Sequence, residues 1–210
     1  MKSSDDYRSI ARIYDLVLNP FLDSIRKDIC GLLLSQNVAR AVDLGCGTGR
    51  QCAFLHKQGI RAYGVDRSPA MLQNAAIKTP EEIKYYREDL RATSFSDNFF
   101  DSAILSLVLH EHEKDIRNRI IREALRITKA NGFLTILDHG RIESMATQVM
   151  HYFSCVPERL AGKKHFRNYL LFMKNRGLQG LVESLPDLKV VEGRKYLFGG
   201  LWLCLARVKK

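Results

Sequence analysis

Three glycines alternate within residues 42–50, VDLGCGTGR, and their spacing points to ligand chemistry. Gly45, Gly47 and Gly49 fall between an apolar run that predicts a strand and a segment that predicts a helix. Glycines at such a turn let the backbone approach a ligand without a Cβ clash, and the following helix N-terminus offers unpaired N–H groups. A tight turn alone would explain one glycine. Three in alternation therefore indicate a backbone cradle for a cofactor.

The spacing also separates the cofactors that use such a loop. A dinucleotide fingerprint needs Gly-x-Gly-x-x-Gly, and Arg50 stands where its third glycine belongs. A Walker loop needs Gly-Lys-Ser/Thr, which is absent. The pattern present, Asp-x-Gly-x-Gly-x-Gly from Asp43, fits neither.

The elements that must position this loop alternate along the chain. Short apolar runs rich in β-branched residues alternate with segments of helical period, which predicts a doubly wound, mostly parallel α/β sheet with helices on both faces. We expect strands at 39–44, 62–65, 83–86, 100–106, 133–137, 188–192 and 201–207. We expect helices at 7–18, 21–34, 50–58, 69–77 and 115–129, the last closed by Asn131 and Gly132.

Residues 142–185 lie between the fifth and sixth expected strands and have a mostly helical pattern. An insertion after the C-terminal end of a strand sits over the ligand crevice of an open sheet, so we expect it to select the substrate. The length favours a single domain of 210 residues. We divide it into an N-terminal helical cover (1–38), a cofactor-binding core (39–138), a helical acceptor-side insertion (139–187) and a C-terminal strand pair (188–210).

The loop resembles that of the class I S-adenosylmethionine-dependent methyltransferases, and the similarity continues in order along the chain. YGVDRSPAML at 63–72, REDLRATSF at 87–95, DNFFDSAIL at 97–105 and EALRITKANG at 123–132 resemble later elements of that family. IARIYDLVLN at 10–19 resembles an N-terminal segment of the ubiquinone and menaquinone biosynthesis C-methyltransferases. A quinone acceptor is not implied, because LVLHE at 107–111 replaces that branch's Gly-Leu-Arg-Asn run.

The resemblance implies a seven-stranded Rossmann-like sheet, S-adenosylmethionine as cofactor and S-adenosylhomocysteine as product. It implies that Asp43 lies near the methionine ammonium, Asp66 near the ribose hydroxyls and Asp89 beside the adenine amino group. The cofactor-binding residues expected in this way are Asp43, Gly45, Cys46, Gly47, Gly49, Asp66, Arg67, Asp89, Leu90, Ser106 and Tyr14.

A sulfonium methyl group is already activated, so such a protein must chiefly hold it in line with a nucleophile and exclude water. His110 and Glu111 follow the fourth expected strand and are the candidate catalytic residues, one of them acting as general base. Shaping the pocket, or capping the helix from residue 115, is an equally open alternative. We expect no metal, because the adjacent side chains at 110–112 diverge and no further ligand cluster is visible.

The formal net charge is +10, and the basic excess lies in the C-terminal third. Residues 139–210 hold 13 basic and five acidic side chains, whereas residues 1–138 hold 20 and 18. The charged residues between positions 159 and 176 are all basic: Arg159, Lys163, Lys164, Arg167, Lys174 and Arg176. A helix there would place Phe166, Tyr169, Leu170 and Met173 on one side, with Lys163, Arg167 and Lys174 beside them. This pattern fits a solvated face, a site for an anionic acceptor, or a peripheral membrane contact.

Composition narrows the remaining classes. Five scattered cysteines without a Cys-x-x-Cys pair, no signal-like start and no long apolar run lead us to expect a cytoplasmic protein. The leading hypothesis is methyl transfer to a small-molecule acceptor, anionic or lipophilic. The alternatives are an RNA or protein methyltransferase, although nucleic acid is less favoured because few aromatics interleave with the cations, or a non-catalytic cofactor-binding protein. The oligomeric state is left open.

Overall fold

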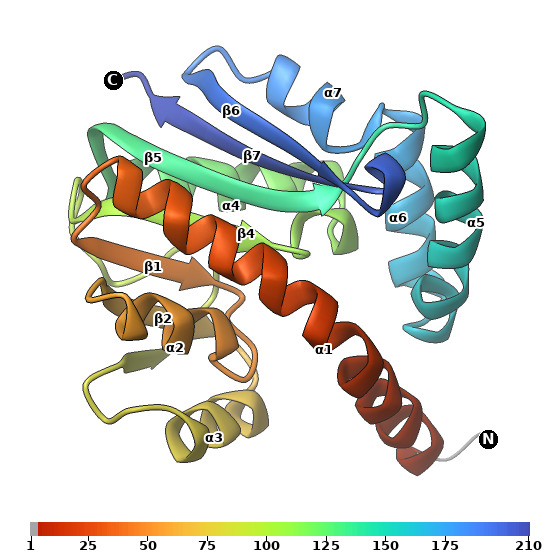
Figure 1. Cartoon of the computed structure of the whole chain (residues 1–210), viewed down its shortest axis with the longest axis horizontal. Helices are drawn as coiled ribbons and strands as arrows, with labels where there is room; N and C mark the ends of the chain where they lie inside the picture. Colours follow the sequence, from red (N-terminus) through yellow and green to blue (C-terminus); the bar gives the residue numbers. More distant parts are fainter. Residues whose placement is uncertain (1–3) are drawn as a thin grey trace.

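The computed structural model describes the backbone from residue 4 and the side chains from residue 20, both to residue 210 (Figure 1). Tyr14, one of the expected cofactor contacts, lies outside the described side chains. The helices are α1 (Ser4–Ser35), α2 (Arg50–Lys57), α3 (Pro69–Lys78), η1 (Leu109–Glu111), α4 (Lys114–Ile127), α5 (Met145–Leu160), α6 (Lys163–Lys174), α7 (Gly177–Glu183) and η2 (Leu197–Gly199). The strands are β1 (Arg40–Leu44), β2 (Arg61–Asp66), β3 (Lys84–Arg87), β4 (Phe100–Ser106), β5 (Thr128–His139), β6 (Leu188–Tyr196) and β7 (Leu201–Val208).

The strands form one sheet in the order β3-β2-β1-β4-β5-β7-β6. Neighbouring strands are parallel except that β7 runs antiparallel to both β5 and β6. The chain moves outward from β1 to β2 and β3, then returns to the other side of β1 as β4. Ligands of open α/β sheets bind where the order reverses in this way. The predicted fold class is confirmed.

The period of two along the strands divides the apolar side chains between two cores. Val42 and Leu44 of β1 pack with residues of α4, α6 and α7 on one face of the sheet. Ala41 packs with residues of α1 and α2 on the other face, where α1 crosses the sheet (Figure 1). Both faces of β1 are therefore covered, and its C-terminal end is left free to meet a ligand.

The N-terminal helix differs from the expectation. Two helices, 7–18 and 21–34, were expected, but α1 is one helix from Ser4 to Ser35 with Pro20 inside it. That prediction was wrong because a proline removes one backbone hydrogen bond and crowds one carbonyl, which bends a helix without always ending it.

The helix expected at 115–129 ends earlier, at Ile127. The Thr128 hydroxyl donates a hydrogen bond of 2.7 Å to the Ala124 carbonyl, and Thr128 already pairs with Phe100 as the first residue of β5. Asn131 and Gly132 therefore lie within β5 rather than at a helix C-cap, with Asn131 in the left-handed conformation at φ 61°.

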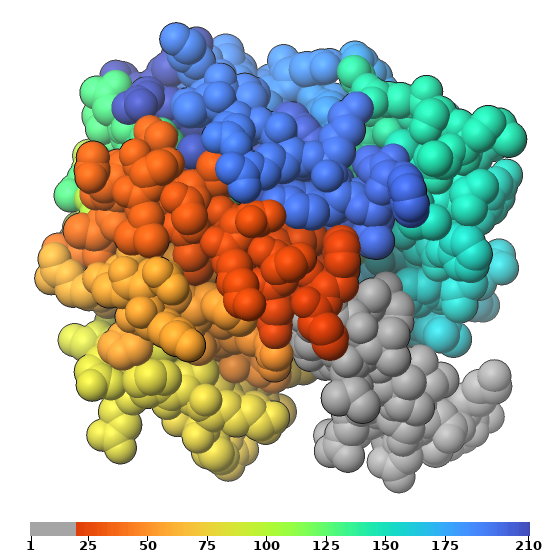
Figure 2. Space-filling model, viewed as in Figure 1, coloured from red at the N-terminus to blue at the C-terminus, as the bar shows by residue number. Residues whose placement is uncertain are grey.

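The segment between β5 and β6 consists of α5, α6 and α7. In Figure 1 α5 and α6 lie together on the right of the molecule and α7 lies at its top, and Figure 2 shows α5 at the surface on the right. On α6 the buried side chains are Asn168, Tyr169 and Phe172, whereas Leu170 is exposed, contrary to the expected stripe. The packed face of α6 is thus rotated from the expected one. Among the described residues, no helix has the length and apolarity that a membrane crossing requires.

The expected basic face of α6 is exposed but partly neutralised by acids from other elements. Lys164 and Arg167 each lie 3.3 Å from the Glu113 carboxylate. Arg176, just beyond α6, pairs with Glu183 of α7 at 2.8 Å. Exposed pairs of this kind contribute little free energy of folding, and they reduce the positive potential that the segment offers to a ligand.

Candidate active site

A cavity of about 300 Å³ opens where the strand order reverses. It is bounded by the C-terminal ends of β2 and β4, the loop after β3, the η1 turn and α4. Its lining residues are Gly45, Asp66, Arg67, Asp89, Leu90, Arg91, Ser106, Leu107, Val108, Glu111, His112, Ile116 and Ile120. Seven of the residues expected in the site thus line one cavity: Gly45, Asp66, Arg67, Asp89, Leu90, Ser106 and Glu111. Asp43, Cys46, Gly47 and Gly49 lie in β1 and its loop, and His110 lies behind the wall.

Gly45 and Gly47 of the loop are glycine for different structural reasons. At Gly45, φ is 87° and an added Cβ would lie 2.5 Å from Cγ2 of Val108, so this position must stay small for the loop to pack on the end of β4. At Gly47, φ is 52° and an added Cβ would meet nothing within 4 Å. Gly47 therefore presents bare backbone to open space, as a cradle for a ligand requires.

Asp66 is held in place by the loop that it faces. Its Oδ2 accepts a hydrogen bond from the Gly47 backbone N–H at 2.9 Å, and its Oδ1 accepts one from Ser68 N–H at 2.8 Å. Each carboxylate oxygen has two lone pairs, so both retain acceptor capacity. The side chain is oriented and still able to accept from a ligand.

Asp43 is buried at the end of β1, and its Oδ1 has no hydrogen-bond partner among the described residues. Burial raises the pKa of Asp43 to about 7, although the nearby Arg26 lowers it. A buried carboxylate without a partner is costly, which makes this position suited to receive a cationic ligand group.

Asp89 is half-exposed and already engaged by a neighbour. The Arg91 guanidinium donates to both of its carboxylate oxygens, from Nε at 2.9 and 3.0 Å and from Nη2 to Oδ2 at 2.5 Å. This pairing lowers the pKa of Asp89 to about 2. The carboxylate is therefore ionised at neutral pH and shared between Arg91 and the cavity.

The far wall of the cavity carries two groups that can accept a proton. The left-handed backbone of Leu107, at φ 57°, turns the chain after β4 and leads into η1. Glu111 and His112 line the cavity from this turn. Burial lowers the pKa of His112 to about 4, helped by the positive charge of Arg67, so its imidazole is neutral at pH 7. Desolvation raises the pKa of Glu111 even though its side chain remains accessible.

His110 faces away from the cavity and is buried, with 4% of its surface exposed. Its Nδ1 lies 2.7 Å from Oδ1 of Asp138, and its Nε2 lies 3.5 Å from Oε2 of Glu158. Burial alone would lower the pKa of His110, but Asp138 and Glu158 together raise it well above its usual range. Its catalytic role stays a prediction, and its contacts are those of a positioning residue.

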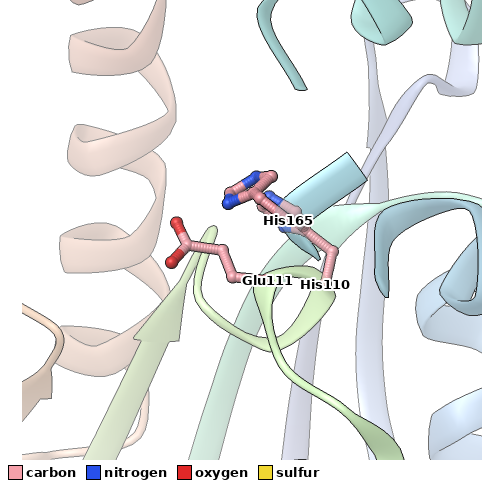
Figure 3. Close-up of side chains that lie close together, drawn as sticks. All are labelled: His110, Glu111 and His165. Atoms are coloured by element: carbon pink, nitrogen blue, oxygen red, sulfur yellow. The ribbon is translucent and has the colours of Figure 1, made fainter. Parts of the chain in front are cut away.

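Sequence reasoning missed the residues around His110. Asp138 and His139 end β5, Glu158 lies on α5, and His165 reaches η1 from α6, where Figure 3 shows it beside His110 and Glu111. One signal was available: the sequence LDHG at 137–140 ends a buried strand on the edge of the sheet that carries the site. Glu158 and His165 had no comparable signal.

Comparison with known proteins agrees with this geometry. Residues 42–136 match the family described as "Methyltransferase domain". Methyltransferase GfsG of Streptomyces halstedii is 28% identical over 150 residues, which cover 66% of this chain and 52% of that protein. Demethylmenaquinone methyltransferase of Thermotoga maritima is 30% identical over 135 residues, covering 61% and 58%. The chain spans about half the length of the curated relatives it matches.

Among solved structures, a Burkholderia thailandensis 1,6-didemethyltoxoflavin-N1-methyltransferase, crystallised with that acceptor and S-adenosylhomocysteine, superposes with a TM-score of 0.63. The match covers 100% of this chain and 92% of that one, at 16% sequence identity. Residues 42–136 thus match a methyltransferase domain, and the chain shares its fold with that solved methyltransferase structure. The predicted resemblance is confirmed.

Proposed function

We propose that this chain binds S-adenosylmethionine in the cavity and transfers its methyl group to a small-molecule acceptor that enters the same cavity beside η1. One observation carries the proposal: the cavity at the reversal of strand order is lined by Asp66 and Asp89 on one side and by Glu111 and His112 on the other. A single space therefore joins groups suited to a cofactor with groups suited to an acceptor.

The residues present fit the cofactor. Asp43 offers a buried carboxylate oxygen without a hydrogen-bond partner to an ammonium group. Asp66 is oriented by two backbone N–H groups and keeps free lone pairs for two hydroxyls. Gly47 exposes backbone to open space, and Leu90 supplies an apolar surface to a base. Arg50 is bound by Asp23 of α1 at 2.7 and 2.5 Å, which fixes the start of α2 beside the loop.

When bound, S-adenosylmethionine supplies a methyl group already activated for nucleophilic attack. The chain then has to hold the acceptor in line and exclude water. Val108, Ile116 and Ile120 give the cavity an apolar wall that displaces water. Of the two residues predicted as catalytic, we propose Glu111 as the proton acceptor, because it faces the cavity and its raised pKa brings it closer to neutral pH. The low pKa of His112 makes it the weaker base.

The insertion supports the choice of a lipophilic acceptor. α5 leaves a continuous apolar face exposed, formed by Met145, Val149, Tyr152, Phe153, Val156 and Leu160. The exposed cations Lys163, Arg167 and Lys174 lie on the neighbouring helix α6. An apolar face beside cations suits a lipophilic molecule with an anionic group, whether it is free or presented at a membrane surface.

The test is turnover. The purified chain is incubated with S-adenosylmethionine and pools of acceptors grouped as lipophilic anions, neutral lipophiles, polar small molecules, RNA and peptides, and S-adenosylhomocysteine is measured. We expect product with lipophilic anions, at a rate that Glu111→Gln lowers. Product only with RNA or peptides would contradict the proposed acceptor class, and cofactor binding without product from any pool would favour a non-catalytic protein.

A further inference from the structure

A cluster of three imidazoles around one carboxylate joins the insertion to the core. His110 comes from η1, His139 ends β5, and His165 and Glu158 belong to α6 and α5. Nε2 of each histidine faces Glu158: His139 lies 3.4 Å from Oε1, whereas His110 and His165 lie 3.5 and 2.5 Å from Oε2. Imidazole nitrogens from three separate elements therefore lie around one carboxylate from a fourth.

We propose that this cluster binds a divalent transition-metal ion, with His110, His139 and Glu158 as its primary ligands and His165 beside the fourth position. The ligand atoms of the three primary residues all lie within 4.8 Å of one another, and all three residues are buried. Imidazole nitrogens with one carboxylate are a usual ligand set for zinc and for other first-row divalent ions. The site needs nothing from the cofactor cavity, although the proposed function places it next to the acceptor.

Two of the three imidazole–carboxylate distances in the cluster fit metal ligands better than hydrogen bonds. Bonds of 2.0–2.1 Å to a tetrahedral ion put neighbouring ligand atoms about 3.4 Å apart. His139 Nε2 lies 3.4 Å from Glu158 Oε1, and His110 Nε2 lies 3.5 Å from Glu158 Oε2. Each distance matches that spacing for the carboxylate oxygen that it involves. Both are longer than the usual N–H···O range of 2.7–3.2 Å. The shorter His165–Glu158 contact of 2.5 Å is a hydrogen bond, and it would have to open by about 0.9 Å for His165 to become a fourth ligand.

Second contacts orient the ligands as in known metal sites. Nδ1 of His110 bonds to the fully buried Asp138 carboxylate at 2.7 Å, which leaves its Nε2 free for an ion. Asp138 also accepts from the backbone N–H of His139 at 2.7 Å. A carboxylate behind a ligand histidine fixes the ring and its tautomer and makes it a better ligand. The Tyr169 ring packs edge-on against His139, 4.9 Å away, and closes the site on the α6 side.

This arrangement corrects the reason for expecting no metal. The neighbours of His110 in the sequence do diverge from it, but its partners come from β5, α5 and α6. Because the three primary ligands belong to η1, β5 and α5, a bound ion would link the insertion to the core directly beside Glu111. Glu111 itself lies within 4.8 Å of His110 and His165, measured between ligand atoms.

The test uses the full chain, dialysed against a chelator and titrated with ZnCl₂ by calorimetry and with CoCl₂ by visible absorption, without S-adenosylmethionine. We expect one ion per chain, a sub-micromolar dissociation constant for Zn²⁺, a tetrahedral Co²⁺ spectrum and a higher Tm. His139→Ala and Glu158→Gln should each weaken Zn²⁺ binding at least 10-fold, and Asp138→Asn by 10- to 100-fold. His56→Ala, in α2 and away from the cluster, is the matched control and should bind as wild type.

No stoichiometric Zn²⁺ binding by the wild-type chain would overturn the site, whether or not the variants fold. Equal affinity in wild type, His139→Ala and Glu158→Gln, with circular dichroism unchanged, would also overturn it. The cluster would then be a hydrogen-bonded network of imidazoles around a carboxylate. Because the readout is metal binding without cofactor, its failure leaves the proposed methyl transfer untouched, and the failure of turnover leaves the metal site untouched.

Discussion

The ends of β1 and β2 hold their carboxylates differently from the end of β5. Within the part of the chain that the structure describes, Asp43 has a buried oxygen without a hydrogen-bond partner, and Asp66 accepts two backbone hydrogen bonds. Asp138 accepts four, from Leu109 N–H, His110 N–H, His139 N–H and the His110 ring. The first pair keeps acceptor capacity for a ligand, whereas Asp138 uses its capacity to position protein groups. The ends of β1 and β2 are therefore suited to bind the cofactor, and the end of β5 is suited to position the residues of η1.

The largest effect should follow from filling the open side of the glycine loop. Gly47→Val places a β-branched residue at φ 52° and projects it into the space in front of the loop, so we expect at least a 100-fold loss of S-adenosylmethionine affinity by calorimetry. Gly31→Ala is the control, because Gly31 lies in α1 with open space around its Cβ position. If Gly47→Val bound S-adenosylmethionine with wild-type affinity, the glycine loop would not be part of the cofactor site.

Substitutions in the η1 turn should affect the rate of methyl transfer more than the affinity for the cofactor. If Glu111 removes a proton from the acceptor, Glu111→Gln should lower kcat by about 10²- to 10⁴-fold and abolish the acid limb of the pH profile. Cofactor affinity should change little. His112→Asn is the comparison, because its imidazole shares the cavity but is a weaker base at neutral pH. A larger loss of rate in His112→Asn than in Glu111→Gln would reverse the assignment.

Asp66 and Asp89, the two carboxylates on the cofactor side of the cavity, should differ in how much each contributes to cofactor affinity. Asp66→Ala should weaken cofactor binding by roughly 10- to 100-fold, because a charge-assisted hydrogen bond contributes about 1.5–3 kcal/mol and the variant also releases the Gly47 backbone. Asp89→Ala should cost less, since Asp89 is half-exposed and shared with Arg91. Calorimetry on both variants checks the order, and equal losses would mean that the loop contact of Asp66 adds nothing.

The smallest effect concerns the free energy of unfolding and its dependence on pH. Because the pKa of Asp43 is raised to about 7 in the folded chain, from 3.8 in the unfolded one, the folded state binds the proton more tightly. Its contribution to stability is therefore lost as the pH rises from about 4 to 7. We expect Asp43→Asn to be more stable than wild type at pH 8 by about 1–3 kcal/mol, by an amount that shrinks toward pH 4.

Urea titrations of both proteins across this pH range, without cofactor, measure the difference. A variant that is less stable than wild type at pH 8 would mean that Asp43 is ionised and satisfied in the folded chain. The same variant should bind S-adenosylmethionine more weakly, because a neutral amide replaces the carboxylate that we place against its ammonium group.

The sequence predicted the parts of the molecule that depend on local pattern. β4 was expected at 100–106 and is found there, and Asp66 and Ser106 lie on the cavity because strand ends of such a sheet share one edge. The His110 cluster could not be predicted in this way. The packing of α5 and α6 brings Glu158 and His165 to His110, and the positions of Glu158 and His165 in the sequence carry no periodic or motif signal.

The most direct test of the central claim is calorimetric titration of the wild-type chain with S-adenosylmethionine and, separately, with NAD. The open backbone at Gly47, the unpartnered oxygen of Asp43 and the position of Arg50 predict saturable binding of one S-adenosylmethionine per chain and no comparable binding of NAD. Equal binding of NAD, or no binding of S-adenosylmethionine at millimolar concentration, would contradict the account.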